Sequence, residues 1–372
     1  MSDYLDRLHA VIDAEVEPNA IHVDVDGAYP TANIDALKSA GLLGIVSAES
    51  VGGEGLGPSA ATAVVSELAR NCTSTAMIIC MHYAATAVLE SLGSEDVRRA
   101  IAENRHVSTL AFSEQGSRSH FWAPLSTATA NGDQVLLDAR KSWVTGAGEA
   151  DSYVWSSTPL AADGPSTLWF VPSDTPGLKI DAPFDGLGLR GNGSSPVSAT
   201  GASIPATNQL GADGGGFDLM IGTVLPWFNL MNSATSVGLM DAAVARSATH
   251  LTSSRLEHLD QSLADNPVNR LHLAHAKVRT DQAAALLAQA VAAVEGGTED
   301  AMLRVLETKV SAGDAAIEVT DLCMRVCGGS AFRKEVGVER LFRDARAAAV
   351  MAPTSDTLYD FIGKAICEIP LF

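Results

Sequence analysis

The sequence is short of basic side chains, and this deficit excludes several classes of partner. Its 372 residues include 25 Lys and Arg against 44 Asp and Glu, a formal net charge of −19. Most of such a surface would repel the phosphates of a nucleic acid and the headgroups of an anionic membrane. We therefore expect neither nucleic acid nor a membrane among its partners.

Long apolar runs and export signals are also missing. The longest apolar stretch, residues 283–294, is interrupted by Gln289 and is too short to span a bilayer. The opening residues MSDYLDRLHA have neither the basic nor the apolar region of a secretory signal. We expect a cytoplasmic protein.

Cysteine is scarce, and its spacing indicates neither a disulfide framework nor a metal site. The five cysteines are an odd number spread over a large chain. Cys323 and Cys327 stand four residues apart, but no histidine or second cysteine pair follows at metal-ligand spacing. Small buried thiols on an apolar helix are the expected interpretation, and we predict no metal.

The order of residue patterns divides the chain into three zones. Residues 1–108 have helical spacing, residues 109–212 hold short β-type runs between Gly, Asp and Pro turns, and residues 213–372 return to helical spacing. No G-x-G-x-x-G follows a strand, and the order is α+β rather than a βαβ alternation. We predict an N-terminal helical domain, a middle antiparallel β-barrel or sandwich, and a C-terminal four-helix bundle.

Capping and turn residues locate individual elements. The pair Asn131-Gly132 between two alternating runs predicts a β-hairpin. Ser94 predicts a helix start, and glycine pairs at 296–297 and 328–329 predict the ends of two long helices. Apolar spacing predicts helices over 60–71, 75–92, 226–250, 269–295, 298–326 and 353–366.

Two segments of the middle zone are unusual for a scaffold. The loop AFSEQGSRSH, residues 111–120, offers backbone N–H groups and hydroxyls to a polar ring or a phosphate, although an ordinary turn has the same composition. In KSWVTG, Trp143 and Thr145 share one face of a strand by the period of two. This pair is typical of an aromatic cofactor pocket, and equally of a core Trp beside a strand Thr.

Two segments of the last zone also stand out. RVCGG, residues 325–329, permits close backbone approach at a helix end, although glycine is more often a plain helix stop. ERLFRDAR, residues 339–346, alternates charge densely, and its default interpretation is a solvated, salt-bridged helix face.

In their order and spacing, these segments resemble the acyl-CoA dehydrogenase flavoprotein superfamily over nearly the whole chain. AFSEQGSRSH is similar to that family's ALTEPGAGSD loop, and KSWVTGAGEADSYV to its KxWITNGxxADxxVV strand. RVCGGSAFRKEVGVERLFRDARAAAVMAPTSD resembles its QxLGGxGYxxxxPVERxxRDAxxxxIxEGTSE signature. The resemblance supports the same three-domain fold.

The resemblance implies FAD bound across a subunit interface, and therefore a dimer or tetramer. Trp143 would pack on the flavin ring, and Thr145 would hydrogen-bond near N5. Arg255 would reach the pyrophosphate of a neighbouring subunit. The positions implied to contact FAD are Leu110, Phe112, Ser113, Gly116, Ser119, Trp143, Thr145, Arg255, Arg325, Gly328, Gly329, Thr354 and Asp356.

The chain departs from the family pattern where the chemistry is expected. The family's glutamate base, which removes the α-proton of an acyl thioester, is replaced by Ala352. An alternative base position of some relatives falls near Phe228, and no carboxylate occurs between Met220 and Asp241. Loss of a general base typically costs about 10²- to 10⁴-fold in rate.

Substitute groups for the missing base are limited. His82 aligns with a segment that borders the substrate cavity in relatives, and it is either an acid–base candidate or a core histidine. His120 and Asp360 are further candidates. Ser119 and Lys364 are expected to contact substrate, because Lys364 stands where some members use an arginine to bind CoA.

Three functions follow from the resemblance and its departures. The first is an FAD-dependent oxidoreductase of acyl-CoA dehydrogenase type, acting on an acyl thioester or related small substrate with a non-standard base. The second is an oxygen-using flavoenzyme similar to the group D flavin monooxygenases, which share the fold and lack the glutamate. The third is a non-catalytic partner that completes the FAD site of a heteromeric assembly.

Overall fold

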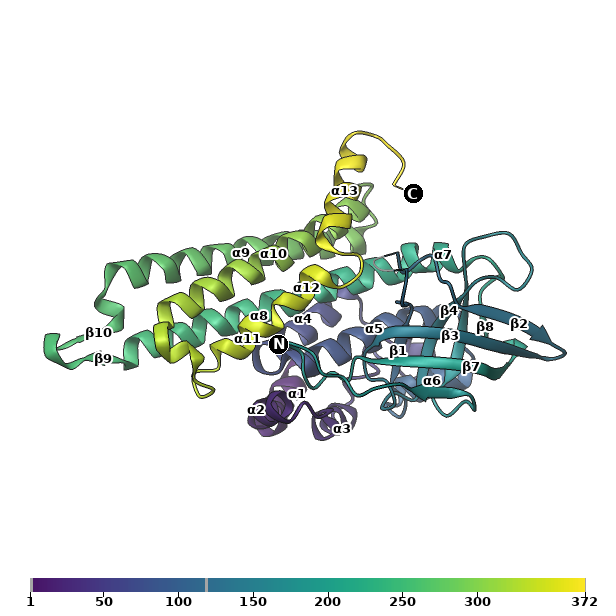
Figure 1. Ribbon diagram of the computed structural model, residues 1–372, viewed down its shortest axis with the longest axis horizontal. Helices are drawn as coiled ribbons and strands as arrows, with labels where there is room; N and C mark the ends of the chain where they lie inside the picture. The colour runs from purple at the N-terminus through teal and green to yellow at the C-terminus, as the bar shows by residue number, and fades with distance from the viewer. Residues whose placement is uncertain (1–2, 118–119, 372) are drawn as a thin grey trace.

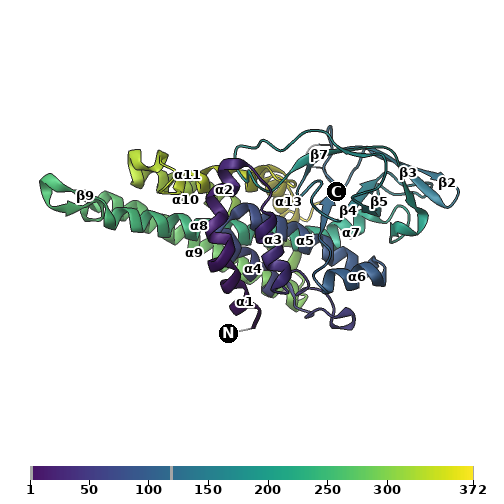
Figure 2. The same cartoon turned by 90° about the horizontal axis from the view of Figure 1, so that it is seen from below.

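The computed structural model describes residues 3–117 and 120–371. Helices occupy both ends of the chain and strands occupy the middle, as predicted. In Figure 1 the long helices α8 (Leu225–Ser253), α9 (Pro267–Gly296) and α10 (Ala301–Cys327) run along the length of the molecule. The strands of the middle zone gather at one end, and the two short strands β9 (Arg255–Leu256) and β10 (Gln261–Ser262) lie at the other. Figure 2 shows helices α1, α2 and α3 on one side of this body.

The N-terminal zone is helical and packs around one apolar helix. Ser94 caps the last of its helices by accepting a hydrogen bond from the N–H of Val97. Its elements are α1 (Asp3–Val11), the π-helical turn η1 (Ile12–Val16), α2 (Glu17–Asp26), α3 (Thr31–Ser39), the short turn η2 (Glu49–Val51), α4 (Pro58–Asn71), α5 (Thr73–Leu92) and α6 (Glu95–Ala102).

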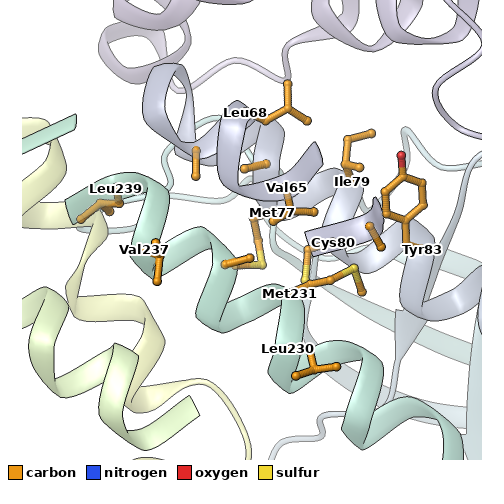
Figure 3. Close-up of a cluster of buried hydrophobic side chains, with 14 of the residues drawn as sticks. Val65, Leu68, Met77, Ile79, Cys80, Tyr83, Leu230, Met231, Val237 and Leu239 are labelled. Carbon is orange, nitrogen blue, oxygen red and sulfur yellow. The ribbon is translucent and has the colours of Figure 1, made fainter. Parts of the chain in front are cut away.

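Helix α5 has the length and apolarity of a membrane span, but its place in the fold explains that composition. Within the described residues, 72% of its most apolar window is buried inside the molecule. Figure 3 shows side chains of α4, α5 and α8, including Val65, Met77 and Met231, packed into one cluster. Because α5 is enclosed by other elements, its apolar surface has the character of a core helix.

The middle zone is a pair of four-stranded sheets. The orders are β1-β4-β5-β8 and β2-β3-β7-β6, and the inner faces of both sheets share a core around Trp155 and Trp169. The strands are β1 (Ser108–Ala111), β2 (Thr127–Asn131), β3 (Gln134–Val144), β4 (Ser152–Ser157), β5 (Thr167–Pro172), β6 (Leu178–Ile180), β7 (Ser195–Pro205) and β8 (Gln209–Leu210).

The topology of the sheets agrees with the predicted sandwich with one exception. The β2–β3 hairpin is present as the Asn131-Gly132 pair predicts, but Asn131 pairs with Gln134, so the two-residue turn is Gly132-Asp133, and Gly132 has φ of 66°. Strand β1, however, pairs in parallel with β4, so the zone is not purely antiparallel. Parallel pairing is possible here because the chain between β1 and β4 makes a long connection that includes β2 and β3 of the other sheet.

The last zone is a bundle of long helices with short elements at its ends. Its main helices are α8 (Leu225–Ser253), α9 (Pro267–Gly296), α10 (Ala301–Cys327), α11 (Val338–Asp344), α12 (Arg346–Val350) and α13 (Ser355–Ile366). The shorter elements are α7 (Gly216–Leu219), the π-helical turn η4 (Met220–Val224), β9 (Arg255–Leu256), η5 (Glu257–Leu259), β10 (Gln261–Ser262), η6 (Leu263–Asp265) and η7 (Gly328–Phe332), whereas the turn η3 (Ala206–Asn208) lies between β7 and β8 of the middle zone.

Glycine sets the ends and the packing of these helices. Gly297 and Gly328 cap α9 and α10 with φ of 60° and 58°, as the sequence predicts. Inside α8, a Cβ on Gly238 would lie 2.1 Å from the carbonyl oxygen of Ser66. Helices α8 and α4 therefore approach so closely that only glycine fits at this position. These features confirm the predicted fold class.

Candidate functional site

A cavity of about 850 Å³ lies where the β-sheets, helix α5 and the segment around α12 meet. Cofactor and substrate sites commonly have this size. We call the side that includes Leu110, Ser113, Ser142, Trp143, Thr145 and Ser194 the sheet wall. We call the side that includes Met77, Leu225, Phe228, Met351, Ala352 and Thr354 the helical wall.

Trp143 and Thr145 both line the cavity, but for a reason other than strand alternation. The β3–β7 register shifts between Lys141 and Val144, and Trp143 has φ of 58°. This bulge turns Trp143 outward, so that 68% of its surface is exposed, with one edge-on contact to Phe184 at 6.4 Å. Thr145 is buried beyond the end of the strand, where its hydroxyl lies 3.0 Å from that of Ser194.

A buried ion pair holds the 111–117 loop against β3. The Lys141 ammonium lies 2.5 Å from Oε1 of Glu114 and donates to the carbonyl and the hydroxyl of Ser156 at 2.7 and 2.9 Å. Oε2 of Glu114 accepts hydrogen bonds from the N–H groups of Leu125 and Ser126 at 2.5 and 3.0 Å. The carboxylate is thus surrounded by donors on both oxygens.

The pKa values of this pair reflect burial and mutual charge. Burial lowers the pKa of Lys141 to about 8, although Glu114 opposes the shift. Burial alone would raise the pKa of Glu114, but Lys141 and the surrounding donors hold it below its ordinary value. Glu114 is therefore an ionised, fully engaged carboxylate and not an available base.

A second buried lysine supports the helical wall. Lys309 of α10 is almost completely buried and donates to the carbonyl oxygens of Ala348, Met351 and Pro353 at 3.1, 3.1 and 2.8 Å. Burial lowers the pKa of Lys309 to about 7. Its three bonds fix the segment that follows α12, on which Ala352 lies, to the bundle.

Ala352, which the sequence resemblance aligns with the family's glutamate base, has no group that can exchange a proton. Ala352 lines the cavity beside Met351, and Phe228 lines it from α8. Among the described lining residues, Glu114 is the one carboxylate, and its oxygens are already occupied. The described residues of the helical wall therefore present no free carboxylate where proton removal from a substrate would be expected, although Arg343, Arg346 and Thr354 also line the cavity on this side.

His82 does not supply this chemistry either. It is completely buried in α5, away from the cavity lining. Its Nδ1 accepts from the N–H of Ser108 and its Nε2 lies 3.2 Å from the carbonyl oxygen of Leu43, so the neutral Nε2–H tautomer satisfies both contacts. Burial lowers its pKa to about 4. We interpret His82 as a core histidine, in contrast to the catalytic role considered from sequence.

Three other predicted polar residues meet at a second, smaller pocket. His120, Asp356 and Lys364 line a space of about 560 Å³ beside α13. The Lys364 ammonium lies 3.1 Å from Oδ2 of Asp360. Thr354, by contrast, lines the main cavity and caps α13 by accepting from the N–H of Thr357. The structure therefore separates Asp356 from the other positions predicted around the flavin ring.

Several predicted FAD contacts lie away from the cavity of their own chain. Arg255 is exposed on β9, where it pairs with Asp260, at the end of the molecule opposite the sheets in Figure 1. Neither it nor Gly116 is among the described residues that line the cavity. The same holds for Arg325, Gly328 and Gly329, whereas Leu110, Phe112 and Ser113 do line it. Ser119 lies outside the described residues.

The 339–346 segment differs from the solvated face expected by default. Arg340 and Asp344 are buried, and the carboxylate of Asp344 accepts from the N–H of Leu189 at 2.7 Å. Arg343 makes two bonds to the carboxylate of Asp24, at 2.8 and 2.6 Å. This segment therefore joins the three zones beside the cavity, because its charges face other elements and not water.

The sequence patterns did not lead us to predict a structural role for either buried lysine, Lys141 or Lys309. Lys309 stands three and four residues after Leu306 and Val305 and three and four before Ala312 and Gly313, which places it on a buried helix face. That spacing was an available signal. For Lys141 the signal was weaker, because the partner Glu114 is distant in sequence.

Comparison with known proteins places these observations in a family. Models of the N-terminal, middle and C-terminal domains of acyl-CoA dehydrogenases match residues 2–103, 109–201 and 214–367. Cyclohex-1-ene-1-carbonyl-CoA dehydrogenase of Geobacter metallireducens is 26% identical over 370 residues, covering 97% of this chain and 96% of its own.

Solved structures share the fold at lower identity. Butyryl-CoA dehydrogenase from Megasphaera elsdenii superposes with a TM-score of 0.91 at 22% identity, covering 98% of this chain and 97% of its own. The FAD complex of PigA gives a TM-score of 0.89 at 17% identity, with 98% and 96% covered.

Proposed function

The chain belongs to the acyl-CoA dehydrogenase superfamily of flavoprotein oxidoreductases, and we propose that it binds FAD and oxidises an acyl thioester or a related small acyl substrate. The observation that carries this proposal is the pairing of an exposed Trp143 with a buried Thr145 hydroxyl on the sheet wall. An exposed aromatic ring at the mouth of a cavity of this volume suits stacking against a planar heterocycle.

The residues present fit an isoalloxazine ring. Thr145 and Ser194 provide hydroxyls, Asn192 a carboxamide and Ser142 a further hydroxyl along one wall, all among the residues that line the cavity. Hydroxyls and a carboxamide on the sheet wall, and apolar side chains such as Met77, Leu225 and Phe228 on the helical wall, match a ring with a polar edge and a substrate with an apolar chain. Bound FAD would supply the two-electron acceptor for the oxidation.

The chain's own groups would bind and orient rather than move protons. Trp143 would cover the ring, and the Thr145 hydroxyl would hydrogen-bond to its edge. The Lys141–Glu114 ion pair would keep the 111–117 loop in place, and Phe228 and Met351 would exclude water from the substrate's carbon chain. Positions such as Arg255 and Gly328 would serve the neighbouring subunit's FAD, which requires a dimer or tetramer.

The lack of a free acid on the described cavity lining favours a second candidate. A flavoenzyme that uses oxygen, on the pattern of the group D monooxygenases, needs no carboxylate at position 352. A non-catalytic partner in a heteromeric assembly fits the same observation. The dehydrogenase remains the first proposal because curated relatives that align over more than nine tenths of the chain are named as dehydrogenases.

An anaerobic titration distinguishes these functions. The purified protein, loaded with FAD, would be mixed with a series of acyl-CoA thioesters while the flavin absorbance is followed. Bleaching by one thioester supports the dehydrogenase and identifies the substrate class. If no thioester bleaches the flavin and chemically reduced protein reoxidises rapidly with oxygen, the monooxygenase is supported. If neither occurs, both enzyme proposals are wrong, and the heteromeric partner is tested by co-purification.

A further inference from the structure

Two buried asparagines on α8 lie one turn apart and lack the partners that buried carboxamides normally have. Asn229 and Asn232 have exposed fractions of 0% and 1%. A spacing of three residues places both side chains on the same side of the helix. Among the described residues, neither Nδ2 nor Oδ1 of Asn229, nor Oδ1 of Asn232, has a hydrogen-bond partner.

Buried polar atoms without hydrogen-bond partners are concentrated on this turn of α8 compared with the rest of the described chain. Twelve buried side-chain polar atoms lack partners in the described residues, and three of them belong to these two asparagines. The buried Asn33, in comparison, donates to the Thr75 hydroxyl at 2.9 Å and accepts from Asn19 at 3.1 Å. Because a buried, unsatisfied polar group is strongly destabilising, such a cluster points to a ligand or an ordered water.

The pair lies one side chain behind the helical wall. Nδ2 of Asn232 is 3.3 Å from Sδ of Met351, which lines the cavity, and a thioether is only a weak acceptor. Phe228, the neighbour of Asn229, also lines the cavity. Met351 therefore stands between Asn232 and the cavity, and its flexible side chain is suited to moving aside.

The chemistry of the pair selects the ligand. Its two carboxamides offer both acceptors and donors and carry no charge. No Asp, Glu, Lys or Arg occurs on α8 before Asp241, so this helix contributes no charge near the pair. The unmatched atoms are the Oδ1 atoms of both residues and Nδ2 of Asn229. A water can donate to both Oδ1 atoms and accept from Nδ2, and a hydroxyl can donate to one Oδ1 and accept from Nδ2. A cation would leave Nδ2 unmatched, and an anion would leave both Oδ1 atoms unmatched.

We propose that Asn229 and Asn232 form a binding site for a neutral, hydrogen-bonding oxygen, supplied by a water molecule in the free protein or by a hydroxyl of the bound substrate. The water source depends on nothing else in the protein. The hydroxyl source rests on the proposed function, because it requires an acyl substrate in the cavity. It would make the substrate an acyl thioester that carries a neutral polar group.

Substitution by leucine of similar size tests the water source. If water satisfies the carboxamides, Asn229→Leu removes real hydrogen bonds and should lower the melting temperature by at least about 2 °C. If the carboxamides are unsatisfied, the same change should raise it. Asn33→Leu is the matched control, since its satisfied carboxamide should make that variant less stable in either case. A crystal structure of the free protein should show a solvent peak within hydrogen-bond distance of both residues.

A pair of probes tests the hydroxyl source. 3-Hydroxybutyryl-CoA and butyryl-CoA would each be titrated into the FAD-loaded protein, and binding followed by the flavin spectrum. A tenfold or larger preference for the hydroxylated probe, lost in Asn229→Leu, supports the site. If neither probe binds, the proposed function fails while the test of the water source stands. A raised melting temperature or a missing solvent peak, together with no hydroxyl preference, overturns the proposal.

Discussion

The two walls of the cavity are each held by a buried lysine, but the lysines have different kinds of partner. On the sheet wall, Lys141 is paired with the carboxylate of Glu114. Behind the helical wall, Lys309 is bonded to three backbone carbonyl oxygens. The first arrangement balances charge with charge in direct contact. In the second, backbone dipoles make the direct bonds to the ammonium, and the charge of Asp314 adds a further favourable contribution.

This difference matches what each wall presents to the cavity. The sheet wall offers hydroxyls and an exposed tryptophan, and its ion pair fixes the loop that belongs to the family's flavin-binding motif. The helical wall presents no carboxylate among the described residues, and it includes Ala352, which the sequence resemblance aligns with the family's base. Under the proposed function, the polar sheet wall would hold the flavin ring, and the helical wall would shape the space for the substrate. Four predictions test this contrast, from the largest expected effect to the smallest.

Removal of Lys141 should have the largest effect, because it leaves a buried carboxylate without its counter-ion. Lys141→Met should lower the free energy of unfolding by about 3–5 kcal/mol. Denaturant unfolding would measure it. The control is the double variant Lys141→Met/Glu114→Gln, which removes both charges and should recover a large part of the loss. A double variant no more stable than Lys141→Met would contradict the charge argument.

Acidification should weaken the support of the sheet wall through His82, which accepts from the first residue of β1. Its pKa is lowered to about 4 in the folded protein, against about 6.5 when unfolded, so the unfolded state binds more protons between these values. The stability from neutral His82 is complete above about pH 6.5 and decreases by about 3 kcal/mol as the pH falls to 4. Unfolding at pH 7 and pH 4.5 would measure the loss. His82→Gln should lose less over the same interval, and an identical pH dependence would refute the assignment.

Removal of Lys309 should lower the free energy of unfolding less than removal of Lys141 does. Without Lys309, carbonyl oxygens lose a hydrogen-bond donor, but no charge in direct contact is left unpaired. Lys309→Met is expected to lower the free energy of unfolding by about 1–3 kcal/mol. The measurement is the same denaturant titration. Lys277→Met, on an exposed lysine of α9, is the control and should change stability little. If Lys309→Met costs more than Lys141→Met, the contrast between the two walls is wrong.

Thr145→Ala should change stability least and flavin binding most. It removes one buried hydrogen bond to Ser194, worth about 1 kcal/mol. Because the hydroxyl is proposed to bind the ring edge, the purified variant should retain less FAD, measured as absorbance per protein. Thr249→Ala, on the exposed side of α8, should retain FAD as the parent protein does. Equal FAD content in both variants would remove the basis for placing the ring at Thr145.

The fold could be predicted from the sequence because the residues that indicate helix ends and turns act locally along the chain. Ser94, the Asn131-Gly132 pair and the glycines after α9 and α10 act through neighbouring backbone groups, so their positions in the chain predict helix ends and turns. The parallel pairing of β1 with β4 was not accessible, because it depends on strands separated by some forty residues.

The candidate functional site could be predicted from the sequence only in part. Trp143 and Thr145 do line the cavity, yet a bulge with a positive φ places Trp143 there and not the strand period that suggested it. His82 has the residue type of an acid–base group, but its two backbone partners come from distant segments. Arg255 and Gly328 were assigned to a neighbouring subunit, and that role stays a prediction.

The sequence by itself determined the charge balance, the order of helical and β zones, the family resemblance and the alanine at position 352. These depend on residue type and on spacing along the chain. The tertiary structure decided which polar groups are engaged and which are not. It occupies both oxygens of Glu114, both nitrogens of His82 and the ammonium of Lys309, and leaves Asn229 without a protein partner among the described residues. Hydrogen bonding in a buried site depends on groups brought together from distant segments, and no local pattern encodes it.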